Sequence, residues 1–167
     1  MSQNFKTHGH LTPEEFFAIV IWKSNRSKTK VVKGIKKNKI EIHIITSEVS
    51  EVETREEKLS ILHPAIPIPG IGIPIASAIL AVCYPNEFTV VDVRALAALK
   101  VLGFKIDGDP TTNHSAYFKY LEKCKELAQE NKVSLRNFDR ILWAKNWYEG
   151  TKGLKHLVRG INTDTKQ

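Results

Sequence analysis

The stretch of residues 68–81 constrains the fold more than any other part of the chain. It reads IPGIGIPIASAILA and contains no charged side chain. Gly70 and Gly72 permit a tight turn, because glycine adopts positive φ and lets other atoms approach the backbone closely. Pro74 suits the first turn of a helix, and the small residues after it permit tight helix–helix packing. The pattern predicts a turn that leads directly into a helix.

The same turn is a candidate anion site. Backbone N–H groups at the start of a helix, reinforced by the helix dipole, bind anions without the help of a charged side chain. A Gly-x-Gly turn is equally compatible with a purely structural role. A dinucleotide-binding fold is disfavoured, because no buried strand precedes the turn and no third glycine follows it.

The charge of the chain is positive and unevenly distributed. Its 167 residues include 25 Lys and Arg against 18 Asp and Glu, a net charge of +7, which permits a polyanionic partner without specifying one. Between residues 23 and 39 the charged residues are all basic, and this basic strip is either a solvated helix face or a phosphate-facing surface. The strip consists of Lys23, Arg26, Lys28, Lys30, Lys33, Lys36, Lys37 and Lys39.

Helix signals dominate the remainder of the chain. Thr12 and Thr54 each begin a capping-box pattern, and Asn113 and Ser134 precede further helical stripes. We expect the apolar stripes to be core faces, among them Phe16, Phe17, Val20 and Ile21, the set Tyr117, Tyr120, Leu121, Cys124 and Ala128, and the set Leu135, Phe138, Ile141 and Leu142.

One segment does not fit the helical scheme. Residues 39–44 alternate polar and β-branched apolar side chains, which locally favours a strand, and the short run 88–91 is the only other extended candidate. Residues 39–45 are therefore left open between helix and strand. We expect a single all-α domain over residues 1–167, with at most one short extended segment.

Asp92 stands where an extended segment enters an apolar helix. Its ordinary role at such a position is that of a helix N-cap. The alternative is a functional carboxylate held beside the glycine turn, since Asp92 follows Gly72 by twenty residues.

These features together resemble one protein family. The turn Pro69–Gly72, the small-residue helix after it and the sequence Val91-Asp92-Val93-Arg94 are similar to the helix–hairpin–helix DNA glycosylase superfamily, which includes relatives of endonuclease III and 8-oxoguanine glycosylase. The close resemblance covers residues 59–102, with a motif core of 54–102, and less specific similarities suggest a divergent branch.

The resemblance implies a two-lobed all-α fold and a double-stranded DNA partner. It also implies that the backbone amides of Gly70, Gly72 and Ile75 hold a DNA phosphate, that a monovalent cation can bind at the hairpin, and that Asp92 is the catalytic aspartate. A carboxylate stabilises the positive charge that develops on the sugar as a glycosidic bond breaks. We expect Lys23, Arg26 and Arg94 to contribute further phosphate contacts.

Two departures from the family pattern narrow the expected chemistry. Bifunctional members carry a Schiff-base lysine two residues after the second hairpin glycine, where this chain has Pro74, so a lyase reaction through that position is excluded. The only cysteines are Cys83 and Cys124, which are too few for a disulfide framework or an iron–sulfur cluster. We therefore expect a monofunctional enzyme with no metal cofactor.

Two other functional classes remain open. One is a helix–hairpin–helix module that binds DNA without cleaving it, and the other, less supported, is a scaffold protein that uses the same fold without DNA. Phe5, Trp22, Trp143 and Trp147 are candidates for stacking on an extruded base, although such residues usually serve packing. No run approaches the roughly 20 apolar residues of a membrane span, and the N-terminal residues lack a signal-peptide core, so we expect an intracellular, cytoplasmic protein with no membrane partner.

Overall fold

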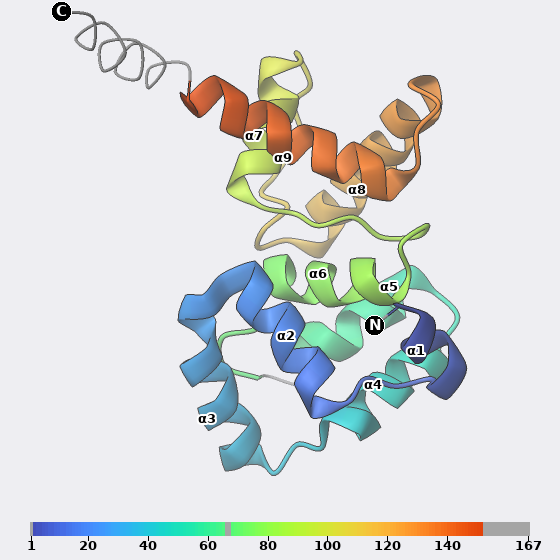
Figure 1. Ribbon diagram of the computed structural model, residues 1–167, viewed down its shortest axis with the longest axis vertical. Helices are drawn as coiled ribbons and strands as arrows, with labels where there is room; N and C mark the ends of the chain where they lie inside the picture. The colour runs from blue at the N-terminus through green and yellow to red at the C-terminus, as the bar shows by residue number, and fades with distance from the viewer. Residues whose placement is uncertain (1, 66–67, 152–167) are drawn as a thin grey trace, which may run out of the picture.

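A computed structural model describes residues 2–65 and 68–151, and every regular element within those two ranges is helical (Figure 1). The predicted all-α class is confirmed. In chain order the elements are α1 (Ser2–His8), α2 (Pro13–Ser24), the 3-10 helix η1 (Asn25–Ser27), α3 (Lys28–Asn38), α4 (Ile42–Glu51), α5 (Arg55–Ser60), the π-helical turn η2 (Ile61–Ala65), α6 (Ile73–Cys83), α7 (Val93–Val101), α8 (His114–Glu130) and α9 (Leu135–Thr151).

The helices form two groups that follow one another along the long axis of the molecule (Figure 1). Helices α7, α8 and α9 make up one group, in which α9 packs against both of the others. Helices α1 to α6 make up the second group, and α6 packs against α2, α5 and α1. The buried side chains of both groups belong to one continuous hydrophobic core. The segment 84–92 carries the chain from the end of α6 into α7.

Helix α6 is the most completely buried helix of its group. Gly72 is its N-cap, Pro74 lies in its first turn, and eight of its eleven residues are buried. A helix that is apolar on all sides is stable only when other helices surround it. The sequence 68–81 therefore does lead into a buried helix.

The predicted capping residues begin the helices expected of them. Thr12 and Thr54 each form a complete capping box, in which the threonine oxygen accepts the N–H of the glutamate three residues later. The Asn113 side chain accepts the N–H of Ala116 at the start of α8, and the Ser134 hydroxyl accepts that of Asn137 at the start of α9. These bonds satisfy N–H groups that no preceding turn can satisfy.

The strand suggested by residues 39–44 does not form. The chain is irregular up to Glu41 and helical from Ile42, because Ile42, Ile45 and Val49 bury one face at helical spacing. Local alternation was too short a signal against that longer pattern. Within residues 2–65 and 68–151, no helix is long and apolar enough to cross a bilayer.

Two predicted core residues lie at the surface instead. Ile21 of α2 and Ile141 of α9 are each nearly half exposed. In α2 the buried stripe runs through Phe16, Ile19 and Val20, so Ile21 lies beyond its edge. The tyrosine stripe of α8 is buried as predicted.

Candidate active site

The segment between α6 and α7 fixes the position of Asp92. Phe88 to Val91 is buried and extended but has no neighbouring strand. Side chains satisfy its backbone instead: the Val91 N–H donates to the Ser77 hydroxyl (3.2 Å), and the Tyr117 and Tyr120 hydroxyls donate to the carbonyls of residues 89 (2.9 Å) and 90 (2.8 Å). Three hydrogen bonds from α6 and α8 therefore hold the chain immediately before Asp92.

Asp92 uses both carboxylate oxygens. Oδ1 accepts the N–H groups of Arg94 and Ala95, both at 2.9 Å, and so caps α7. Oδ2 accepts a hydrogen bond from Nζ of Lys23, also at 2.9 Å, and this ion pair joins α2 to the start of α7. The Lys23 side chain is 9% exposed and that of Asp92 is 29% exposed, so the carboxylate remains accessible to a ligand while its cation is largely covered.

The environment of Asp92 keeps it ionised. Burial opposes the charged form, but the Ala95 N–H, the Lys23 ammonium and the Arg94 N–H together hold the pKa of Asp92 below its ordinary value. A carboxylate that stays negative, half-buried and fixed in direction can stabilise a positive charge on a bound molecule.

A second carboxyl group belongs to the same cluster. Asp139 of α9 interacts electrostatically with Lys23 and Asp92, and burial raises its pKa to about 6. Lys23, the Thr89 hydroxyl and Arg136 favour its ionised form, whereas Asp92 opposes it. The Thr89 hydroxyl is fully buried and makes no hydrogen bond of ordinary geometry. We call Lys23, Asp92 and Asp139 the carboxylate cluster.

Sequence analysis did not identify Asp139. The signal was present, because Asp139 follows Leu135 by four residues and precedes Leu142 by three, and both leucines are buried. Helical spacing therefore places this acidic residue on the inner side of α9. An ionisable residue on a buried helix face is uncommon and is a marker of functional sites.

The glycine turn has the geometry that the sequence suggested. The Ile71 N–H donates to the Ile68 carbonyl (3.0 Å), with Pro69 and Gly70 between them and a φ of 98° at Gly70. This arrangement is that of a type II turn, which favours glycine at its third position. Gly72 has φ −106°, and a Cβ there would meet only Pro74 at an ordinary 3.6 Å. The fold therefore requires a glycine at position 70 but not at position 72.

The turn packs closely on α3. A Cβ at Gly34 would lie 2.4 Å from Cδ of Pro69, and one at Gly70 would lie 3.0 Å from Cβ of Lys30 and 3.4 Å from the Ser27 carbonyl. The basic strip therefore passes directly beside the turn. The first part of the strip runs from the end of α2 to the start of α3. At one end of this segment Lys23 belongs to the carboxylate cluster, and at the other end Ser27 and Lys30 lie against the turn.

The predicted phosphate ligands are not all free to serve as such. The Ile75 N–H donates to the Gly72 carbonyl (3.0 Å), so this amide is already used within the helix. Lys23 is covered and bound to Asp92, which is a different position from the solvent-facing phosphate contact we expected. Among the described residues, the N–H groups of Gly70 and Gly72 donate no hydrogen bond. Arg26 is exposed on η1.

Three of the aromatic side chains considered for stacking on a base are exposed, and one of them contacts the start of α7. Trp22, next to Lys23, is 65% exposed, while Trp143 and Trp147 of α9 are 47% and 57% exposed. The guanidinium of Arg94 lies 5.8 Å from the centre of the Trp143 ring, a cation–π contact that ties the exposed arginine to α9. Phe5 is instead buried against Tyr84, so it is a packing residue.

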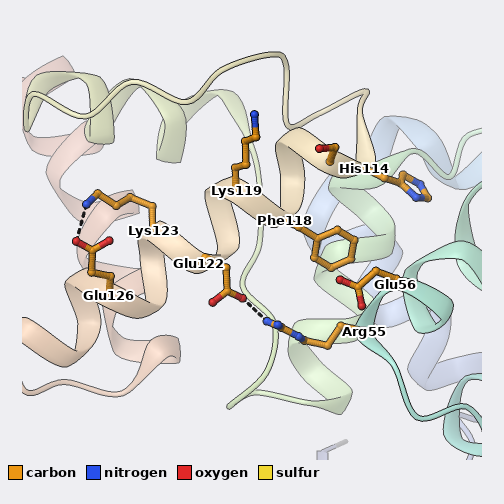
Figure 2. Close-up of a pocket in the computed structure, with 9 residues that line it drawn as sticks. Arg55, Glu56, His114, Phe118, Lys119, Glu122, Lys123 and Glu126 are labelled. Carbon is orange, nitrogen blue, oxygen red and sulfur yellow. Dashed lines mark hydrogen bonds and ion pairs between the residues drawn. The ribbon is translucent and has the colours of Figure 1, made fainter.

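An open groove lies elsewhere, along α8 and the start of α5 (Figure 2). It encloses about 810 Å³, and its charged side chains pair with one another, as Arg55 does with Glu122 and Lys123 with Glu126. None of the predicted site residues lines it. Its rim includes His114, whose Nε2 lies 3.1 Å from Nδ1 of His63, a pair that sequence spacing did not reveal.

Other reactive groups in the described ranges are inert or scattered. Burial raises the pKa of the Cys83 and Cys124 thiols to about 12 in each case, so both are core residues as predicted. No group of three or more His, Cys, Asp or Glu side chains in residues 2–65 and 68–151 is arranged to hold a metal ion.

The carboxylate cluster and the adjacent glycine turn are thus the part of the described structure with the most specific chemistry. The chain matches no family model, no curated protein and no solved structure in comparisons with all three.

Proposed function

We propose that the protein binds double-stranded DNA and hydrolyses the N-glycosidic bond of a base that has been turned out of the helix, as a monofunctional glycosylase of the helix–hairpin–helix type. The observation that carries the proposal is the position of Asp92, an ionised and accessible carboxylate held in place by α6, α7 and α8. The segment from Lys23 to Lys30 connects it to the glycine turn, because Lys23 pairs with Asp92 while Ser27 and Lys30 lie against Gly70. The sugar of the reacting nucleotide would place its developing positive charge against this carboxylate.

The turn and the basic strip would hold the DNA backbone. Among the described residues, the N–H groups of Gly70 and Gly72 donate no hydrogen bond and are available for a phosphate. The fold has room for a side chain at position 72, so a glycine there is explained by the close approach of a phosphate. Arg26 follows Lys23 by three residues and Arg94 follows Asp92 by two; both are exposed and would add charge-assisted contacts. A monovalent cation at the turn carbonyls belongs to the same proposal and awaits a binding measurement.

Base release measures the proposed activity directly. Duplexes that each contain one uracil, 8-oxoguanine, hypoxanthine, alkylated or mismatched base would be incubated with excess protein, and alkali would convert each abasic site into a strand break. We expect release from at least one duplex, and a loss of about 10²-fold or more for Asp92→Asn, since removal of one transition-state charge partner costs this much in comparable sites. Asparagine still caps the helix, so the loss reports the charge.

Asp109→Asn is the matched control. Asp109 also accepts a backbone N–H, from Thr111 at 2.8 Å, but it lies on an exposed turn away from the cluster. Base release by Asp109→Asn should equal that of the unmodified protein. Equal release by Asp92→Asn would contradict the proposed role of Asp92.

One observation favours a second candidate, a DNA-binding module without catalysis. The helix cap and the Lys23 ion pair already give Asp92 a complete structural role. In that case the protein would bind duplex DNA with a steep salt dependence, as expected of phosphate contacts, but would release no base from any duplex of the panel.

The two glycines offer a separate test of the turn. Gly72→Ala should leave the fold intact and weaken DNA binding, because the added methyl group meets only Pro74 within the protein but would face the phosphate. Gly70→Ala forces an L side chain into positive φ and should cost about 1–2 kcal/mol of stability. Unchanged DNA affinity of Gly72→Ala at 0.05 M and 0.2 M salt would contradict the phosphate contact.

A further inference from the structure

Two histidines, one from each group of helices, lie side by side. His63 belongs to η2, in the group of α1 to α6, and His114 is the first residue of α8 in the other group. Nδ1 of His63 lies 3.1 Å from Nε2 of His114, and both side chains are half-buried. We propose that this pair binds a divalent transition-metal ion such as Zn²⁺ between its two facing nitrogens, and that the ion joins the two groups of helices.

Local structure fixes the backbone of each histidine. Pro64 follows His63, and a residue before proline favours extended backbone. His63 accordingly has φ −167° and ψ 120° inside a segment that is otherwise helical. Asn113 caps α8 by accepting the N–H of Ala116 (2.9 Å), so His114 begins a helix of 17 residues at a defined position.

The separation of the two nitrogens fits two metal–ligand bonds. A Zn–N bond is about 2.0–2.1 Å long, so two such bonds place their nitrogens about 2.9 Å apart at a right angle and about 3.3 Å apart at the tetrahedral angle. The observed 3.1 Å lies between these values. The ring centres are 5.3 Å apart and the ring planes are tilted by 46°, so the rings do not stack face to face. An ion therefore fits between the two nitrogens with little movement of either ring.

A hydrogen bond is the other way to fill this space. In the neutral pair one ring donates an N–H and the other accepts it, and the tautomers decide which ring is the donor. A metal ion needs a lone pair on both facing nitrogens, which the other tautomer of the donor ring supplies without loss of a proton. Burial and the neighbouring His63 hold the pKa of His114 below its ordinary value, so His114 is neutral above pH 7, as a metal-ligating histidine must be.

The surroundings of the pair leave room for further ligands of the ion. His114 lines the groove along α8 at the end opposite Lys123 and Glu126, so solvent reaches this side of the pair (Figure 2). In the part of the chain that the structure describes, no third His, Cys, Asp or Glu joins the two histidines, so water completes the coordination. Two protein ligands with open positions suit an exchangeable ion, since closed structural zinc sites have four.

The inference goes beyond the proposed function and does not rest on it. None of the residues proposed to bind DNA or to cleave the glycosidic bond lines the groove. The ion would instead link η2, which precedes the glycine turn in the chain, to the start of α8.

The test is a calorimetric titration with Zn²⁺ at pH 7.5, above the ordinary histidine pKa of about 6.5, on protein without an affinity tag. We expect the unmodified protein to bind one Zn²⁺ per chain. His63→Gln and His114→Gln should each lower the affinity by at least about 10-fold, because an amide is a poor substitute for imidazole at such an ion. Saturating Zn²⁺ should raise the melting temperature of the unmodified protein and should not raise that of either variant.

His10→Gln is the matched control. His10 is another half-buried histidine, and its ring centre lies 6.2 Å from that of His8 and 6.3 Å from that of His43. This variant therefore also reports any binding of Zn²⁺ to those three rings, and its affinity should equal that of the unmodified protein.

A second measurement locates the ion without any substitution. In nitrogen-15 spectra of the histidine rings, Zn²⁺ should shift Nδ1 of His63 and Nε2 of His114 in the unmodified protein, which settles the site even where a variant fails to fold. No binding stronger than about 1 mM would overturn the inference. So would binding that both histidine variants retain, or binding that His10→Gln loses. Base release is not a readout here, so failure of the proposed function and failure of this inference are separate results.

Discussion

The carboxylate cluster and the groove along α8 differ in how many cations accompany their carboxylates. In the groove, Glu122 is shared by Arg55 and Lys125, and Lys123 has Glu126, so cations are at least as numerous as the carboxylates they meet. These carboxylates are more than half exposed, and water screens them. In the cluster, two carboxyl groups share one lysine that is 9% exposed.

The difference indicates in which of the two regions the charged groups cost folding free energy. Surface charges that pair off cost the fold little and add little to it. A surplus carboxyl group in a half-buried cluster costs folding free energy, since burial penalises the charged form. Asp139 is the carboxyl group that carries this cost, and it belongs to the same cluster as Asp92.

Removal of the shared cation should produce the largest loss of stability. Lys23→Met keeps a similar side-chain length but removes the lysine that Asp92 and Asp139 share, and leaves Asp92 without its ion-pair partner. We expect a loss of about 2–4 kcal/mol in the free energy of unfolding at pH 7.5, because a half-buried charge is left without its partner. Urea denaturation would measure it, with Lys100→Met on the exposed side of α7 as control. Equal, small losses for both variants would show that the cluster is no more sensitive than the surface.

Removal of the surplus carboxyl group should stabilise the protein. The pKa of Asp139 is higher in the folded protein than in the unfolded chain, so the folded state binds its proton more tightly, and stability falls as pH rises from about 4 to about 6. Asp139→Asn has no carboxyl group to ionise at this position, so above pH 6 it should be more stable than the unmodified protein by about 1–3 kcal/mol. The gain should shrink below pH 4. Urea denaturation at several pH values measures both, and a destabilised variant at pH 7.5 would contradict the account.

A substitution in the groove should change the stability of the protein least. Glu122→Gln removes the carboxylate that pairs with Arg55, yet we expect a change of less than about 0.5 kcal/mol, because the pair is exposed and screened. The same urea titration at low and at high salt would check it. A loss as large as that of Lys23→Met would remove the contrast between the two regions.

The sequence allowed the helices and their caps to be predicted, because those depend on local patterns. Thr12, Thr54, Asn113 and Ser134 each accept the N–H of the residue three positions later. Residues 39–45 were left open between helix and strand, and the structure is helical from Ile42 because the longer apolar spacing in α4 outweighs a short alternation.

The candidate site was only half predictable. Asp92 and the glycine turn are marked by local sequence, but the partners of Asp92 are not. Lys23 lies 69 positions earlier in the chain, and Asp139 lies 47 positions later. Their approach depends on the packing of α9 against α7 and on how the end of α2 reaches the start of α7, which periodicity does not determine.

The side chains that hydrogen-bond to the backbone of residues 88–91 could not be predicted from the sequence for a related reason. Tyr117 and Tyr120 were correctly placed in the core from their spacing, but their hydroxyl groups serve carbonyls that a strand partner would otherwise satisfy. Ser77 was read as a small packing residue, and it also holds the Val91 N–H.

The central claim is that the Asp92 carboxylate stabilises positive charge on a bound sugar. The most direct measurement compares the affinity of the protein for two otherwise identical duplexes, one with a cationic pyrrolidine in place of the target sugar and the other with the neutral tetrahydrofuran. We predict tighter binding of the cationic duplex by the unmodified protein, by about 10²-fold or more as expected of a transition-state mimic, and loss of that preference in Asp92→Asn. Equal affinity of the unmodified protein for the two duplexes would contradict the account.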